Sequence, residues 1–432
     1  MELIVRNARL HVRGGLKRRP AELCDIGIEK GRIACIEKRL DTSAAQEIDA
    51  AGNLVSPPFI DPHLHMDAVL SVGDPRYNES GTLLEGIKIW GERKPSLTKE
   101  VIKKNARKVV DWQIAQGIQH VRTHADVSDP TLLPLSALLE VKDEVRDLLD
   151  LQIVAFPQDG VYTVPDGEKL MLRAMEMGAD VVGGIPHNEL TREDGVRDVE
   201  LAFKLAERFD AMIDIHCDET GDDQSRFVEV MAKNAIFSGM RSRVAASHTT
   251  SMHNFNNDYA LKLMGIFKRA GMNFITNPFD NSVLQNRTDG YPRRRGHTRV
   301  DELWAAGVNV SIGHDSIMDP WYPMGRGSML EAAGLLMHMA HMSGYDQIHA
   351  LFDMITLNSA VTLGIERSYG LEVGKEANLI ILDASDEMEA IRLASECLFV
   401  LRKGRIVART KPAVREVGFQ GEALRTIDFK KG

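Results

Sequence analysis

The sequence predicts an α/β protein in which a (β/α)8 barrel, or TIM barrel, is joined to a small β-sandwich built from both chain termini. Three observations support this fold class. The two ends of the chain alternate apolar and polar residues, as antiparallel strands do. Between the ends, eight short apolar runs alternate with helix-like segments. Several of these runs end in residues that can bind a metal ion, and a barrel has its active site at the carboxyl ends of its strands.

The terminal strands are predicted from ELIVRNARLHV and DIGIEKGRIACIEK, in which the Lys-Gly pair at 30–31 suits a tight turn. The C-terminal part repeats this pattern in ANLIILDA and CLFVLRKGRIVART, with a second Lys-Gly pair at 403–404. Because matching patterns stand at both ends, we expect one β-sandwich domain from residues 1–56 and 370–432. Residues 57–369 then form the barrel domain.

The barrel strands are predicted from eight apolar runs that are too short for helices. They are residues 54–60, 118–123, 151–156, 181–185, 212–215, 244–247, 274–276 and 308–312. The segments between them include DVELAFKLAERFD and NDYALKLMGIFKRAG, whose apolar residues recur at helical intervals. Eight buried strands alternating with helices favour a closed barrel over an open doubly wound sheet. The absence of a glycine-rich dinucleotide motif after any strand supports the same choice.

Composition excludes several functional classes. A chain of 432 residues can bury a large core, either as one barrel with attachments or as two to three domains. The net charge of −9 and the lack of a long basic segment argue against a nucleic-acid partner. Four scattered cysteines fit a reducing cytoplasm. Because we find neither a targeting signal nor an apolar run long enough to cross a bilayer, we expect a cytoplasmic protein without a membrane partner.

A metal site is predicted from His63 and His65, which follow the first barrel run in PPFIDPHLHMD. Two imidazoles one residue apart on a strand point to the same side and can share one ion. Two later runs end in His216 and Asp315. Three neutral nitrogens and one carboxylate suit Zn²⁺ or Fe²⁺, with a position left for water. Such an ion lowers the pKa of bound water from about 16 toward about 7 and so provides a nucleophile.

Two further residues are candidates for proton transfer beside this metal site. His248 ends the sixth run, where it can orient the attacking water or accept its proton together with Asp315. Glu219 follows His216 by three residues, where the chain turns away from the strand, so its carboxylate can deliver a proton to the substrate. We therefore predict Glu219, His248 and Asp315 as catalytic residues.

The chain resembles the cytosine deaminases of the amidohydrolase superfamily in segments that occur in a fixed order. They are HLHMD, HVRTHADVSD, LQIVAFPQDG, IPHNELTRE, DIHCDE, ASHTTSMH, RRGHTRV and GHDSIMDPWYP, followed by LEVGKEANLIIL in the terminal sheet. The resemblance implies one divalent ion, iron with zinc able to substitute, and hydrolytic loss of ammonia from a free pyrimidine base. It also implies a role in pyrimidine salvage and a homo-oligomer such as a hexamer.

The resemblance also assigns residues to substrate binding. Gln158 matches the position whose amide reads the ring carbonyl and the adjacent N–H, for which a glutamine offers both a donor and an acceptor. Leu83 is placed beside the base and Trp321 near the pocket floor. The fourth strand ends in GGIPHNE and lacks the lysine that bridges two metals in related enzymes. One metal is therefore expected, and a cyclic-amide hydrolase of the dihydroorotase or hydantoinase kind is the less favoured alternative.

Three residues depart from the cytosine deaminase pattern. Asn188 replaces an aromatic residue and Asp280 an apolar one, and their roles are left open. Ser316 replaces a second aspartate close to ring carbon 5. Because serine is smaller and uncharged, we expect conversion of 5-methylcytosine to thymine as well as of cytosine to uracil. Isoguanine or another cyclic amidine remains an alternative substrate, and a metal-free scaffold protein is an alternative of a different class.

Overall fold

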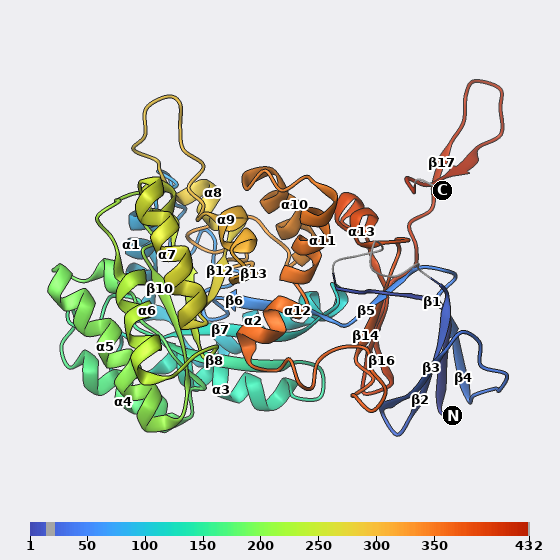
Figure 1. The fold of residues 1–432 in the computed structure, drawn as a ribbon, viewed down its shortest axis with the longest axis horizontal. Coiled ribbons are helices and arrows are strands. Elements are labelled where there is room, and N and C mark those ends of the chain that lie inside the picture. The colour runs from blue at the N-terminus through green and yellow to red at the C-terminus, as the bar shows by residue number, and fades with distance from the viewer. Residues whose placement is uncertain (14–21, 431–432) are drawn as a thin grey trace.

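The computed structural model describes residues 1–13 and 22–430 and has a barrel of parallel strands at its centre (Figure 1). Eight strands of the described residues form it: β6 (Phe59–Leu64), β7 (Ile118–Asp126), β8 (Asp150–Phe156), β9 (Val181–Val182), β10 (Met212–Cys217), β11 (Val244–His248), β12 (Asn273–Thr276) and β13 (Asn309–Ile312). Each strand pairs with the next, and Leu64 bridges Asp315 to close the ring. The predicted (β/α)8 barrel is confirmed.

The closure of the barrel fixes part of the predicted metal site. The amide of Asp315 donates to the carbonyl of His63 at 2.8 Å, and the amide of His65 donates to the carbonyl of Asp315 at 3.0 Å. Main-chain bonds therefore hold these three residues together at the seam between the first and the last strand.

The prediction of one strand over residues 54–60 is wrong. The chain forms two strands there, β5 (Leu54–Ser56) in the terminal sheet and β6 in the barrel. Pro57 and Pro58 lie between them, and proline cannot donate to a strand ladder. The fourth strand also ends earlier than predicted, at Val182, since two glycines follow and glycine weakens a strand.

Helices cover the outside of the barrel (Figure 1). Within the described residues they are α1 (Leu83–Arg93), α2 (Lys99–Ala115), α3 (Leu133–Val145), α4 (Gly167–Met177), α5 (Arg192–Phe209), α6 (Phe227–Ser238), α7 (Asn257–Ala270), α8 (Pro278–Leu284), α9 (Val300–Ala305), α10 (Met329–Met339), α11 (Tyr345–Met354) and α12 (Leu357–Leu363), with short 3-10 turns η1 (Lys94–Ser96), η2 (Pro186–Asn188) and η3 (Thr250–Asn254). None of the helices in the described part of the chain has both the length and the apolar character needed to span a membrane.

Helix α7 shows how the sequence sets these elements. The side chain of Asn256 accepts from the amide of Tyr259 and caps the first turn, and Gly271 ends the helix with a φ of 63°. Leu263 and Phe267, four residues apart, are fully buried on the face toward the barrel. Burial of side chains of this size stabilises the folded state by about 2–3 kcal/mol each.

Strands from both chain ends form a second sheet beside the barrel (Figure 1). They are β1 (Leu3–Leu10), β2 (Cys24–Glu29), β3 (Arg32–Glu37), β4 (Gln46–Asp49), β5, β14 (Leu379–Leu382), β15 (Cys397–Arg402) and β16 (Arg405–Arg409). Helix α13 (Glu387–Leu393) connects β14 to β15. A separate hairpin of β17 (Arg415–Val417) and β18 (Arg425–Ile427) follows β16. The predicted turns at 30–31 and 403–404 join β2 to β3 and β15 to β16. Residues 14–21 and 431–432 of the predicted terminal domain lie outside the described residues.

Candidate active site

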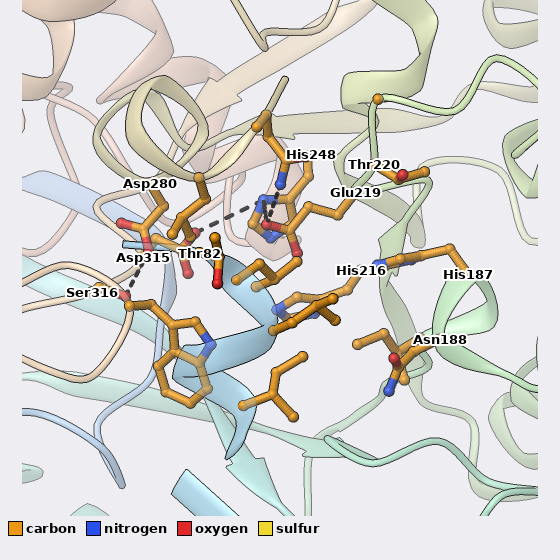
Figure 2. Close-up of a pocket in the computed structure, with 18 of the residues that line it drawn as sticks. Thr82, His187, Asn188, His216, Glu219, Thr220, His248, Asp280, Asp315 and Ser316 are labelled. Carbon is orange, nitrogen blue, oxygen red and sulfur yellow. Dashed lines mark hydrogen bonds and ion pairs between the residues drawn. The ribbon is translucent and has the colours of Figure 1, made fainter. Parts of the chain in front are cut away.

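A cavity of about 360 Å³ opens at the carboxyl ends of the barrel strands (Figure 2). Nearly all of the predicted site residues line it: His65, Leu83, Gln158, His216, Glu219, His248, Asp315, Ser316 and Trp321. His63 is fully buried and is not part of the cavity wall, although its ring lies next to those of His65 and His216. The barrel thus brings together residues that are up to 258 positions apart in the sequence, from His63 to Trp321.

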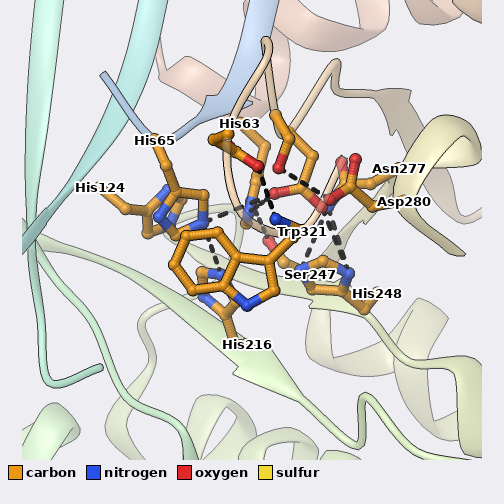
Figure 3. A network of polar contacts seen from close by, with 12 residues as sticks. His63, His65, His124, His216, Ser247, His248, Asn277, Asp280 and Trp321 are labelled. Atoms are coloured by element: carbon orange, nitrogen blue, oxygen red, sulfur yellow. Dashed lines mark hydrogen bonds and ion pairs between the residues drawn. The ribbon is translucent and has the colours of Figure 1, made fainter. Parts of the chain in front are cut away.

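The three predicted histidine ligands, His63, His65 and His216, lie close together (Figure 3), and Asp315 lies beside two of them. The Nε2 atoms of His65 and His216 lie 3.1 Å apart. Oδ1 of Asp315 lies 3.4 Å from Nε2 of His63 and 3.5 Å from Nε2 of His65. Ligand atoms that share one ion at about 2.1 Å lie about 3.0–3.4 Å from one another. These three distances are compatible with donor atoms that share an ion.

The hydrogen bonds around His63 leave its Nε2 atom free to bind an ion. Ser247 donates its only hydroxyl hydrogen to Oδ1 of Asp214 at 2.6 Å, while its oxygen lies 3.0 Å from Nδ1 of His63. The hydroxyl oxygen can then only accept, so Nδ1 of His63 is the donor and Nε2 has a free lone pair. No other described residue forms a hydrogen bond with that Nε2. Ligand histidines are typically oriented in this way.

Burial keeps the histidines of the cluster in the neutral form that binds metals. It lowers the pKa of His65 to about 4 and those of His63 and His216 well below the ordinary value. Among the described residues, two overlapping groups have the spacing of ligands: His63 with His65 and His124, and His63 with His216 and His248. The histidine clusters at this end of the barrel can therefore hold a divalent metal ion.

Glu219 is directed into the cavity by the residue before it. Asp218 has a left-handed φ of 54° and turns the chain after β10. Its carboxylate accepts from the amides of Phe227 and Val228, both at 2.9 Å, and so caps the start of α6. Glu219 itself is only 5% exposed, and burial raises its pKa to about 8 although Gln285 donates to it. Burial thus favours the protonated form of this carboxyl, in which it can act as an acid.

His248 lies between two of the carboxyl groups. Its Nδ1 is 3.5 Å from Oε1 of Glu219 and 3.8 Å from Oδ2 of Asp315. The amides of Asn277 and Asn281 also contact the ring, with Nδ2 of Asn281 3.0 Å from the same Nδ1 and Nδ2 of Asn277 3.2 Å from Nε2. Burial lowers the pKa of His248 well below its ordinary value. The arrangement allows His248 to exchange a proton with a molecule bound beside Asp315.

The walls of the cavity are formed by the predicted substrate-binding residues. Leu83 begins α1 and packs with Trp321, whose ring centre is 6.2 Å from that of His65. Gln158 follows β8 at the cavity wall and is 6% exposed. The side-chain amide of Asn188 donates to the main-chain carbonyl of Gln158 at 3.5 Å. Asn188 thus contacts the loop that positions Gln158, a role that was left open from the sequence.

Sequence reasoning missed the contribution of the segment after β12. Asn277, Asn281 and Gln285 contact His248 or Glu219, and Asp280 accepts a hydrogen bond from Ser316 at 2.8 Å. The available signal was the polar run NPFDN, which directly follows the seventh predicted strand. Polar residues at a strand end indicate a site in a barrel, but nothing in their spacing says which neighbours they will contact.

The amidohydrolase family matches residues 46–408, which include the whole barrel and the site. The chain belongs to the amidohydrolase family. A structure of 5-methylcytosine deaminase from Klebsiella pneumoniae liganded with 5-fluorocytosine is 46% identical, with a TM-score of 0.91 over 95% of this chain and 98% of that chain. N-isopropylammelide isopropyl amidohydrolase from Pseudomonas sp. (strain ADP) is 32% identical over 96% of this chain and 98% of its own. Pterin deaminase from Rhizobium rhizogenes is 26% identical over 85% of this chain and 84% of its own.

These findings confirm the predicted resemblance and the class of enzyme. This amidohydrolase is a hydrolase that acts on C–N bonds, and its similarity to the 5-methylcytosine deaminase covers both the barrel and the terminal sheet. The other two relatives act on different rings, so the family alone leaves the substrate open.

Proposed function

We propose that this protein deaminates a free pyrimidine base, converting 5-methylcytosine to thymine and cytosine to uracil with release of ammonia. The observation on which this rests is the position of Glu219, a buried acid beside the histidine cluster in a cavity that also contains the amide of Gln158. The similarity to the Klebsiella 5-methylcytosine deaminase supports the choice of ring.

The proposed mechanism assigns proton transfer to residues of this chain. An iron or zinc ion held by His63, His65, His216 and Asp315 would supply a nucleophile near neutral pH by lowering the pKa of water. His248 and Asp315 accept the proton of the attacking water. Glu219, whose protonated form is favoured by burial, gives its proton to the ring nitrogen next to the carbon under attack, which avoids an unstabilised anion. Glu219, left as a carboxylate, takes up the proton held by His248, whose Nδ1 lies 3.5 Å from its Oε1, and passes it to the leaving amine. It recovers its own proton from the added hydroxyl group as the ring carbonyl forms.

Recognition of the ring is assigned to the cavity walls. The amide of Gln158 offers a donor and an acceptor to the ring carbonyl and its adjacent N–H. Leu83 and Trp321 pack against the faces of the base. Ser316 faces ring carbon 5, where its small side chain leaves space for a methyl group. A site that accommodates one methyl group changes catalytic efficiency by about 10- to 200-fold at most, so we expect both cytosine and 5-methylcytosine to react.

A panel of ring substrates tests this proposal. Protein loaded with Fe²⁺ or Zn²⁺ is assayed for ammonia release with cytosine, 5-methylcytosine, isoguanine and pterin, and for amine release with N-isopropylammelide. Turnover of both cytosines, with thymine identified as the product from 5-methylcytosine, is the expected result. Turnover of pterin, isoguanine or N-isopropylammelide without turnover of either cytosine base would contradict the proposed substrate and would indicate another cyclic amidine.

A further inference from the structure

Asp280 and Ser316 form a buried polar pair in the wall of the cavity (Figure 2). The hydroxyl of Ser316 donates to Oδ2 of Asp280 at 2.8 Å, and the two residues are 1% and 2% exposed. Because a serine hydroxyl has a single hydrogen, Ser316 has none left for a ligand. Asp280 is therefore the member of the pair with hydrogen-bonding capacity to spare.

The second oxygen of Asp280 is unsatisfied. Oδ1 is buried, and none of the groups in the described part of the chain forms a hydrogen bond with it. Buried polar atoms are paired in most structures, and an unpaired one at a cavity wall is unfavourable until a ligand pairs with it. Asp280 comes from α8, on the same side of the cavity as Asp315 and Ser316, and Asn188 lies on the opposite side (Figure 2). Asp280 thus lines the cavity with one carboxyl oxygen that has no partner among the described residues.

The acidic surroundings of this oxygen restrict what can pair with it. Burial raises the pKa of Asp280 well above its ordinary value, as does repulsion from Asp319 and Glu219. A hydroxyl group both donates and accepts, so it can pair with Asp280 whether the carboxyl is ionised or protonated. A methyl group or a halogen cannot donate. A carboxylate substituent would meet repulsion from Asp280, Asp315 and Asp319.

We propose that Asp280 determines specificity by binding a hydroxyl substituent of the substrate ring, so that 5-hydroxymethylcytosine is a further substrate of this site. The inference rests on the proposed pyrimidine deamination, in which Ser316 faces ring carbon 5. Water adds at the amino-bearing carbon, the C–N bond to the amine breaks and ammonia leaves, which gives 5-hydroxymethyluracil. The hydroxymethyl group takes no part in the chemistry and is held by Asp280 alone.

The test compares substrates within each variant. We expect wild-type holoenzyme to deaminate 5-hydroxymethylcytosine with a kcat/KM at least equal to that for 5-methylcytosine. Asp280→Leu, which has a similar size and no oxygen, should lower the ratio of the two kcat/KM values at least tenfold. Asp280→Asn keeps a side-chain oxygen and should keep the ratio within threefold. Asp301→Leu, on the exposed face of α9, is the matched control and should not change the ratio.

Binding of the products gives a second measurement that does not depend on turnover. The ratio of the dissociation constants for thymine and 5-hydroxymethyluracil, measured by calorimetry on folded protein, should fall at least tenfold in Asp280→Leu. An unchanged ratio in both assays would overturn the role of Asp280, as would a wild type that deaminates 5-methylcytosine but not 5-hydroxymethylcytosine. Absence of turnover with either base would instead contradict the proposed function itself. If Asp280→Leu does not fold, Asp280→Ala replaces it under the same criteria.

Discussion

The Nε2 atoms of His65 and His216 lie 3.1 Å apart, although His65 directly follows the first strand of the barrel and His216 lies in the fifth. In a ring of eight strands these two strands face each other across the barrel. The contact therefore depends on the closure of the barrel at Leu64 and Asp315. A metal site at this place requires the complete ring of strands and cannot form in a fragment of it.

Replacement of His216 by alanine should abolish metal binding and turnover while the protein remains folded, because the four ligands come from three strands and His216 is the only one from the fifth. The bound metal is measured by elemental analysis, ammonia release reports activity, and circular dichroism reports folding. His338→Ala is a suitable control, since His338 is exposed on α10. Retention of the metal together with near-normal turnover in His216→Ala would remove His216 from the ligand set.

Glu219→Gln should retain the metal and the affinity for substrate but lose turnover by more than the 10²–10⁴ that is usual for one acid–base group. The reason is that the same carboxyl, with a pKa raised by burial to about 8, is proposed to serve two proton transfers. Single-turnover kinetics measures the loss in the chemical step, and product affinity measures whether binding is retained. Glu193→Gln, exposed on α5, should behave as wild type. A loss below about tenfold in Glu219→Gln would assign the proton to another residue.

Ser316→Asp should lower the ratio of kcat/KM for 5-methylcytosine to that for cytosine at least tenfold. The new carboxyl would occupy the space proposed for the methyl group and would lie against Asp280, which Ser316 contacts at 2.8 Å. Ser316→Ala adds no bulk and should change the ratio less than threefold. The measurement is the pair of kcat/KM values in each variant. An equal ratio in wild type and Ser316→Asp would show that this residue does not set the size of the pocket.

His11 should make the stability of the protein depend on pH. Its side chain, 2% exposed, lies 2.7 Å from Glu387 of α13 and 3.2 Å from Asp353 of α11. Burial lowers the pKa of His11, but these two carboxylates outweigh burial and raise it from 6.5 to about 9. A group with a raised folded-state pKa stabilises fully below its unfolded pKa and loses that contribution as the pH rises through the folded value. The shift corresponds to about 3 kcal/mol.

The expected outcome for His11 is a melting temperature that differs most between wild type and His11→Gln near pH 6 and least above about pH 9. Thermal unfolding of both proteins at pH 6, 7.5 and 9.5 measures this difference, with His338→Gln as the control for loss of an exposed histidine. If the difference in melting temperature between wild type and His11→Gln stays constant with pH, His11 is not charged in the folded protein.

Local sequence patterns were sufficient to predict most elements of the fold and the strand ends at which the candidate site residues lie. Periodicity identified eight barrel runs and the terminal strands, and it placed His63, His216, His248 and Asp315 at strand ends, because side-chain alternation and helical spacing are local properties of the chain. The prolines at 57 and 58 are a signal for a break in the strand, but the apolar character of residues 54–60 led to the prediction of one continuous strand. A local pattern cannot say that one apolar run is shared between two sheets.

The contacts within the site could not be predicted from the sequence, because they depend on how the whole barrel packs. Ser316 pairs with Asp280, and Asn281 pairs with His248, across 36 and 33 positions of the chain. The orientation of His63 depends on a serine 184 positions away. Such contacts follow from the closure of the barrel and from the path of each loop after its strand, and both are properties of the packed ring. The physical reason is that hydrogen bonds act over about 3 Å, whereas sequence patterns report only which face of an element a residue occupies.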